Sequence, residues 1–300
     1  MAEISAQLVK QLREKTGAGM MECKKALVEA NGSMDEAEVI LRKRGQASAA
    51  KKSARSAKQG LIVSSITNGG KLGVMVEVNC ESDFVARTDE FQQFAASIAA
   101  HVAANAPADV AALLEQPFEG GLTVGQTLTA KIAKIGENMV VARFARHQAK
   151  GIAGNYIHPG SQLGVLVDVT CTKPETAARP EFQELIHDLA MQVAAADPKF
   201  LRKEDVTPDA LAKEKDIQRA RALAEGKPEK IVDKVVEGRL AKFYEEFCLL
   251  EQPFIKENSV SIHQLLADKG KAVGDTLDVV AFVRFKVGET APAEEAGSEA

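Results

Sequence analysis

The side chains that most often carry out catalysis are scattered through this 300-residue chain. It contains no His-Glu-x-x-His metal motif, no Gly-x-Ser-x-Gly nucleophile turn and no Gly-x-x-x-x-Gly-Lys phosphate cradle. The five histidines lie far apart in the sequence, at His101, His147, His158, His187 and His263. We therefore expect no catalytic site, no cofactor and no directly bound nucleotide.

The four cysteines have neither metal-binding nor disulfide spacing. Cys23, Cys80, Cys171 and Cys248 never approach a Cys-x-x-Cys pattern, and isolated thiols are typical of a reduced compartment. The first residues carry charges where a signal peptide needs an apolar stretch. Apolar runs stay below the roughly 18 residues that a membrane span requires. We expect no metal site, no membrane contact and a cytoplasmic location.

The charge balance argues against a nucleic-acid-binding role. Lys and Arg number 38 against 42 Asp and Glu, which gives a net charge of −4 and no overall cationic field for a phosphate backbone. Aromatic residues make up 5% of the chain and Trp is absent, so platforms for stacking bases are not expected. Recognition must depend on a few anchor side chains.

An internal duplication reveals the elements that would position such anchors. Residues 71–107 match residues 162–198 without gaps, and fifteen of the thirty-seven pairs are identical, whereas average composition gives about three. In each copy, alternating apolar residues followed by a helical apolar period predict a strand and then a helix. We expect an α+β fold with duplicated core subdomains at 60–148 and 149–287.

The two copies differ where the strand connects to the helix. Residues 81–87 read ESDFVAR and residues 172–178 read TKPETAA, so they share one alanine. Only the first copy has an acid followed directly by an aromatic residue there, Asp83 and Phe84. In one interpretation Asp83 caps the helix and Phe84 enters the core. In the other, Phe84 is an exposed apolar anchor and Asp83 is directed at a polar or metal-bearing site of a partner.

The N-terminal segment is predicted to form a separate three-helix domain at 1–45. Gly17 and Gly19 interrupt the first two helices, and Ser33 with Glu36 fits a capping box at the third. So small a bundle buries little apolar area and needs a further surface to pack against. Small and basic residues at 46–59 predict a flexible or weakly helical basic linker.

The second copy also contains an insertion. The offset between the copies rises from 91 to 149, so 58 residues have been added. Pro208, Pro228 and apolar residues at helical spacing predict an inserted antiparallel helical hairpin, a short coiled coil, at about 208–247. This hairpin is either a contact device or a structural arm. The segment 288–300 lacks an apolar period and predicts a disordered acidic tail.

Two motifs resemble the signatures of the elongation factor Ts family. Residues 12–27, LREKTGAGMMECKKAL, resemble the first, and Ser82-Asp83-Phe84-Val85 resembles the second, which usually begins with Thr. The resemblance covers residues 1–287, and the N-terminal bundle is similar to a ubiquitin-associated fold. It implies a translation elongation factor without catalytic chemistry of its own. Such a guanine nucleotide exchange factor binds elongation factor Tu in its GDP form, dislodges Mg²⁺ and promotes GDP release.

The resemblance also implies roles for individual residues. The motif at 82–85 would dislocate Mg²⁺ from the partner GTPase. Arg13, Met20 and Met21 would contact the nucleotide-binding domain of that GTPase, and His158 matches a family position that also faces the partner.

Two other functions compete with this interpretation. A helical-bundle adaptor that binds proteins without exchange activity would explain the bundle but would leave the duplicated core without a role. An enzyme acting between the copies would need ionisable residues around His158, where the sequence offers only Asp168. The stoichiometry with the GTPase, homodimerisation of the chain and the surface that the hairpin contacts stay open.

Overall fold

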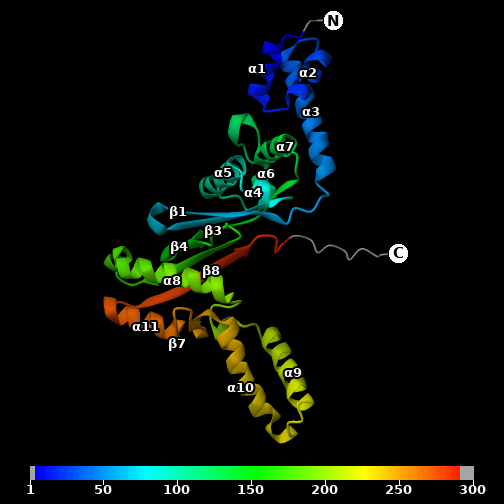
Figure 1. Cartoon of the computed structure of the whole chain (residues 1–300). Helices are drawn as coiled ribbons and strands as arrows, with labels where there is room; N and C mark the ends of the chain where they lie inside the picture. The colour runs from blue at the N-terminus through cyan, green and yellow to red at the C-terminus, as the bar shows by residue number, and fades with distance from the viewer. Residues whose placement is uncertain (1–3, 291–300) are drawn as a thin grey trace.

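The computed structural model describes residues 4–290 and confirms the α+β class. Two antiparallel three-stranded sheets lie face to face, and helices cover the outer side of each sheet (Figure 1). The N-terminal helices lie at one end of the molecule, and a pair of long helices projects at the other (Figure 1). Among the described residues, no helix combines the length and apolarity needed to cross a membrane.

Three helices form the N-terminal bundle: α1 (Ala6–Thr16), α2 (Met20–Glu29) and α3 (Met34–Lys52). Ser5 and Ser33 cap α1 and α3 by accepting backbone N–H groups, and Gly17 ends α1 with a positive φ of 69°. Leu12, Cys23 and other small or aliphatic side chains of the bundle fill its core. The bundle therefore has an apolar core of its own.

Helix α3 continues seven residues beyond the predicted end of the bundle at residue 45. Half of the predicted linker at 46–59 is thus regular helix, because its Ala, Lys and Gln residues favour helix and Ala49 is buried against the first core cluster. Lys52 donates from Nζ to the carbonyl of Ile132 at 3.4 Å. The helix thereby joins the bundle to α7 of the core.

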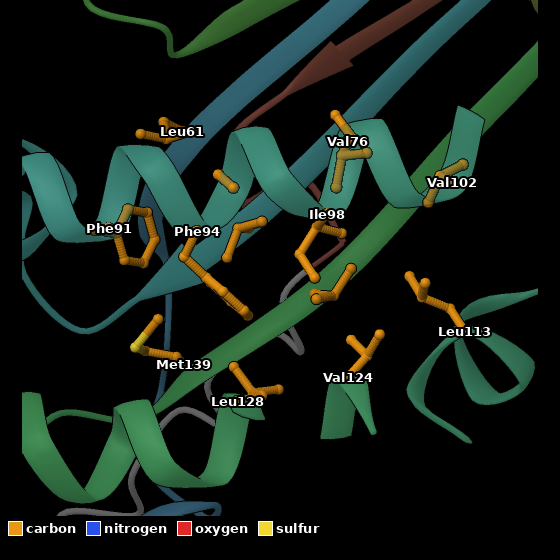
Figure 2. Packing of buried hydrophobic residues seen from close by; sticks show 14 of the residues in the cluster. Leu61, Val76, Phe91, Phe94, Ile98, Val102, Leu113, Val124, Leu128 and Met139 are labelled. Atoms are coloured by element: carbon orange, nitrogen blue, oxygen red, sulfur yellow. The ribbon is translucent and has the colours of Figure 1, made fainter. Parts of the chain in front are cut away.

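The first sheet has the order β1-β2-β3, with β1 (Gln59–Thr67), β2 (Leu72–Cys80) and β3 (Met139–Gln148). Between β2 and β3 the chain forms α4 (Asp83–Ala86), α5 (Asp89–Asn105), α6 (Val110–Glu115) and α7 (Val124–Ile135). Figure 2 shows Phe91, Phe94 and Ile98 of α5 packed between the sheet and the side chains that follow it in sequence.

The second sheet repeats this arrangement in the order β4-β5-β8. Its strands are β4 (Ile152–Ile157), β5 (Leu163–Cys171) and β8 (Leu277–Lys286), with α8 (Pro180–Ala196) and α11 (Ile262–Val273) on the outer face. The register of each sheet shifts at the same place, after Glu77 in β2 and after Asp168 in β5. The duplication seen in sequence thus extends to the irregularities of the strands.

The predicted offset of 149 is wrong, because Val124 begins α7 whereas Val273 ends α11. Met139 and Leu277 pair with the equivalent Cys80 and Cys171, so the offset is 138 and 47 residues have been added, not 58.

The insertion contains α9 (Pro208–Ala224) and α10 (Glu229–Phe247), which pack antiparallel and project from the core (Figure 1). Ala222 of α9 is buried with Val232, Val236 and Leu240 of α10, so the seam is narrow. The remaining short elements are 3-10 turns and a two-stranded ladder: Asn68–Gly70, Glu119–Gly121, Pro174–Ala178, Lys203–Asp205, Leu249–Glu251, β6 (Pro253–Phe254) and β7 (Glu257–Ser261).

The two sheets also exchange hydrogen bonds through buried carboxylates at equivalent positions. Glu77 of the first sheet accepts the backbone N–H of Gly288, which follows β8, at 2.8 Å. Asp168 of the second sheet accepts the N–H groups of Lys150 and Gly151, which follow β3, at 2.8 and 2.9 Å. Each central strand therefore holds the segment that leaves the other sheet.

The contacts of Gly288 and Glu289 show that the predicted start of the acidic tail, at residue 288, is wrong. Gly288 is bonded to Glu77, and Glu289 lies 3.2 Å from Arg143 and 3.5 Å from Arg284. The order of the chain thus extends past residue 288, where the tail was expected to begin. The rest of that expectation, at 291–300, lies outside the described residues.

A glycine permits the close contact between the sheets and gives a test of the fold. A Cβ on Gly164 of β5 would lie 2.6 Å from Ile62 Cγ2 and 2.9 Å from Met75 Sδ, both in the first sheet. We expect Gly164→Ala to lower the free energy of unfolding by about 1–3 kcal/mol, because the sheets must separate or repack. Urea denaturation measures this change.

The control for this variant is Gly238→Ala on α10, since apart from the adjacent residues and backbone of the same helix no heavy atom of the described chain lies within 4 Å of its Cβ position. That substitution should raise the free energy of unfolding by up to about 1 kcal/mol through helix propensity. If Gly164→Ala were as stable as the wild type, the close packing of the sheets would be refuted.

Candidate functional site

The segment that differs between the two copies forms a single tight helical turn between β2 and α5. Ser82 begins α4, and its hydroxyl oxygen accepts the N–H of Val85 at 3.4 Å. Thr88 caps α5 in the same way, accepting the N–H of Phe91 at 3.4 Å. Two successive N-caps therefore define the conformation of the motif at 82–85.

Phe84 points away from the core on this turn. Its side chain is 79% exposed, more than any other large apolar side chain among the described residues. Its neighbours anchor the turn, since Val85 packs against the first core cluster and Ala86 is buried. The interpretation in which Phe84 enters the core is therefore wrong.

Asp83 does not cap the helix, contrary to one interpretation of the sequence. The cap is Ser82, whereas the Asp83 carboxylate accepts a 2.7 Å hydrogen bond from Arg87 Nη2 and is partly exposed. It lies in the first turn of α4, where a negative charge is favourable. The exposed surface of the turn thus presents an aromatic ring beside a paired carboxylate.

A second segment, directly before β3, fixes this turn. Glu137 accepts the backbone N–H of Ser82 at Oε2 (2.9 Å) and the Ser82 hydroxyl at Oε1 (2.6 Å). Cys80 donates from Sγ to the carbonyl oxygen of Ser82 at 3.1 Å. Ser82 is therefore held through its amide, its hydroxyl and its carbonyl.

The next residue connects the same region to the N-terminal bundle. Asn138 donates its backbone N–H to Glu81 Oε1 at 2.6 Å, and its side-chain amide donates to the carbonyl of Arg55 at 2.8 Å. Arg55 in turn lies 3.5 Å from Glu81. The end of α3, the turn at Ser82 and the start of β3 thus form one hydrogen-bonded unit.

The predicted contact residues of the bundle lie on its surface. Arg13 is exposed, and Met20 and Met21 at the start of α2 are 47% and 64% exposed. The turn before them rests on the core, since a Cβ on Gly17 would lie 3.2 Å from Cδ of Lys134 near the end of α7. Glu137 follows that same end of α7, so the bundle and the Phe84 turn are attached to one element.

His158 belongs to a different part of the molecule. It is exposed in the turn between β4 and β5, its N–H donates to Leu163 O at 2.9 Å, and its Nδ1 lies 3.0 Å from the Tyr156 hydroxyl. The structure therefore distributes the predicted residues over three places: the bundle, the turn at 82–85 and the second core copy.

The second copy also has a carboxylate that binds the start of the strand-to-helix connection, but no aromatic residue lies in that connection. Asp275, the counterpart of Glu137, accepts the N–H groups of Thr172 and Lys173 at 3.0 Å each, and the Thr172 hydroxyl also bonds to it. Desolvation alone would raise the pKa of Asp275, but the hydrogen bonds from Thr172 and from the N–H groups of Lys173 and Thr276 hold it well below its usual range. A 3-10 turn at Pro174–Ala178 follows, in place of α4.

Sequence comparison of the copies finds Asp83 and Phe84 but misses Glu137 and Asn138. A signal was present, because Gly136-Glu137 and Gly274-Asp275 both place an acid directly after the glycine that ends a helix.

In the described part of the chain, no group of three His, Cys, Asp or Glu residues is arranged to hold a metal ion.

Comparisons with known proteins agree with these motifs. A family model described as elongation factor TS matches residues 81–289. The elongation factor Ts of Desulfovibrio desulfuricans is 46% identical over 290 residues, which cover 96% of this chain and 99% of that protein. The one from Clostridium perfringens is 47% identical over 287 residues, covering 95% and 93%, and that from Trichlorobacter lovleyi is 43% identical over 289 residues, covering 95% and 93%.

The duplicated α+β core, the exposed Asp-Phe turn and these similarities place the chain in the class of elongation factors. Within this class, it belongs to the elongation factor Ts family. The family model begins at residue 81, whereas the matches to whole relatives also include the N-terminal bundle.

The packing of the Ser82 turn predicts the reactivity of the thiol beneath it. Burial raises the pKa of Cys80 to about 12, and the negative charge of Glu137 adds to the rise. At pH 8 the thiolate fraction is then on the order of one in 10⁴, so iodoacetamide should leave Cys80 unmodified in the native protein. Peptide mapping by mass spectrometry measures this.

Cys171, at the equivalent strand end of the second copy, is less buried and should be modified faster than Cys80. Both should react fully in denaturant. Rapid modification of Cys80 in the folded protein would show that the Ser82 turn opens.

Proposed function

We propose that this chain is a guanine nucleotide exchange factor for elongation factor Tu. In this proposal it binds the GDP form of that GTPase in the cytoplasm, dislodges Mg²⁺ and promotes GDP release so that GTP can rebind. The observation that carries the proposal is the 79% exposure of Phe84 on a turn whose other residues are fixed. Membership of the elongation factor Ts family supports the same role.

Exchange of this kind needs differential binding and no covalent chemistry. A factor that binds the nucleotide-free GTPase better than the nucleotide-bound form must weaken nucleotide binding by the same ratio, because the two equilibria are linked. Phe84 and Asp83 supply an apolar wedge and a negative charge for this purpose. The wedge would displace a segment near the metal, and the charge of Asp83 would compete for the polar groups around it.

The magnitude of the effect requires more than one side chain. Accelerating release about 10⁴-fold lowers the barrier by roughly 5.5 kcal/mol. Burial of one Phe contributes about 1.5–3 kcal/mol. Loss of Mg²⁺ coordination and the contacts of Arg13, Met20 and Met21 are therefore needed as well.

We also propose that the parts of the chain divide these contacts among them. The bundle, as a ubiquitin-associated-like domain, would bind the nucleotide domain of the GTPase beside the turn at 82–85. The second core copy, through His158, and the hairpin would bind elsewhere on the partner. The contact of α3 with α7 supports this division, because it places the bundle beside the helix that leads to Glu137 and the turn at 82–85.

The proposal is tested by following release of fluorescent GDP from purified elongation factor Tu. Added in substoichiometric amounts, the chain should accelerate release with turnover, because it dissociates once nucleotide rebinds. Binding without acceleration would instead identify a protein-binding adaptor and reject the exchange function.

A variant tests the wedge itself. Phe84→Ala should slow exchange tenfold or more, since about 1.5–3 kcal/mol of apolar burial is lost in the complex. Thermal unfolding should be unchanged, because Phe84 is mostly exposed. Ile255→Ala, which removes another exposed apolar side chain (39% exposed) from the second copy, is the matched control and should exchange normally. Full activity of Phe84→Ala would reject the wedge.

A further inference from the structure

We propose that Glu137 is a positioning residue that holds the Asp83-Phe84 turn in the orientation needed for exchange. The inference rests on the proposed function for its consequence, but the positioning itself is a property of the free chain. It adds to the sequence motif a residue that lies 54 positions after Asp83 and belongs to another segment.

The turn that carries Phe84 cannot hold its own shape. Helix α4 has four residues, and an isolated helix of that length lacks the hydrogen bonds needed for stability. The Ser82 hydroxyl oxygen accepts the N–H of Val85 in this turn, and Glu137 accepts the N–H of Ser82 itself. The Glu137 carboxylate binds both the amide and the hydroxyl of Ser82, at 2.9 and 2.6 Å, so it restrains the rotation of the residue that caps the turn.

Glu137 is itself fixed on both sides. Gly136 ends α7 with a positive φ of 91°, and its N–H donates to the carbonyl of Ile132. Asn138 is almost fully buried and is tied to Glu81 and Arg55, and β3 begins at the next residue. Because the residues on both sides of Glu137 are fixed to the core, its carboxylate holds the turn in a defined position relative to the core.

Other contacts restrain the turn, and the Cys80 thiol also donates to the Ser82 carbonyl, but the amide and the hydroxyl hydrogen of Ser82 are both bonded to Glu137. Arg87 pairs with Asp83 within the turn, and Val85 and Ala86 anchor its inner side. These contacts keep the turn attached to the core. The two bonds from Glu137 instead fix the angle at which α4 leaves β2, and this angle sets the direction of the Phe84 ring.

The second copy supplies an internal control for this inference. Asp275 accepts the N–H of Lys173, the counterpart of Ser82, and also the N–H and hydroxyl of the preceding Thr172. The 3-10 turn that follows carries no exposed aromatic residue in the described structure. Removing either carboxylate removes the hydrogen bonds at the start of the strand-to-helix connection in its copy. Only removal of Glu137 should change the orientation of Phe84.

The first measurement uses the free chain. Because the chain contains no Trp, Phe84→Trp introduces a single fluorescent reporter at an exposed position. In this background Glu137→Ala should lower the tryptophan fluorescence anisotropy, since the ring gains local motion. Asp275→Ala should leave the anisotropy unchanged. Glu137→Gln should preserve most of it, because the Gln oxygen can accept the Ser82 N–H while its amide donates to the hydroxyl.

The second measurement uses GDP release in the chain that retains Phe84. Glu137→Ala should reduce the maximal release rate at saturating factor by about tenfold, as expected for misplacement of a contact group. The concentration that gives half-maximal release should change less, since the bundle still binds. Glu137→Gln and Asp275→Ala should remain within about twofold of the wild-type rate, a difference too small to mark loss of a positioned group.

The outcomes separate the two proposals. Unchanged anisotropy and unchanged release in Glu137→Ala would overturn the positioning role. Reduced anisotropy, together with normal release by both Glu137→Ala and Phe84→Ala, would support the clamp and reject the wedge function. If Glu137→Ala loses its native thermal transition, Ser82→Ala replaces it, and a smaller change in the same direction supports the clamp while none overturns it.

Discussion

The face-to-face contact of two three-stranded sheets is the constraint on which the rest of the structure depends. Strand β2 is buried along its whole length, because the second sheet covers one face and α5 covers the other. Small residues at the contact, such as Gly164, let the strands approach. The helices must then lie outside, and the connections between strands and helices are placed at the edges of the layers. A binding residue on such a connection is exposed but rigidly supported.

The duplication explains how one of these connections could change without loss of the fold. Both copies retain an acid that binds the start of the connection, Glu137 in the first and Asp275 in the second. This shared support preserves the path of the backbone. The residues beyond it are free to differ, and in the first copy they present Phe84 at the surface next to the attachment point of the N-terminal bundle.

The sequence predicts the repeated elements well, because strand alternation and helix periodicity are local and occur twice. It fails where an outcome depends on distant contacts. The choice between a buried and an exposed Phe84 depends on a hydroxyl and a carboxylate 55 residues apart, and the order at Gly288 depends on Glu77, 211 residues earlier. The extension of α3 is an intermediate case, since its composition favours helix but burial of Ala49 against the core determines its extent.

The bond between Glu77 and Gly288 also has a consequence for synthesis of the protein. A ribosome makes the N-terminal residues first, and early segments ordinarily fold while later ones are still being added. Here the carboxylate in the middle of the first sheet is fully buried in the finished molecule and receives its backbone N–H partner from almost the last described turn. The first sheet therefore reaches its final hydrogen bonding only after Gly288 has been added, 140 residues after β3 ends at Gln148.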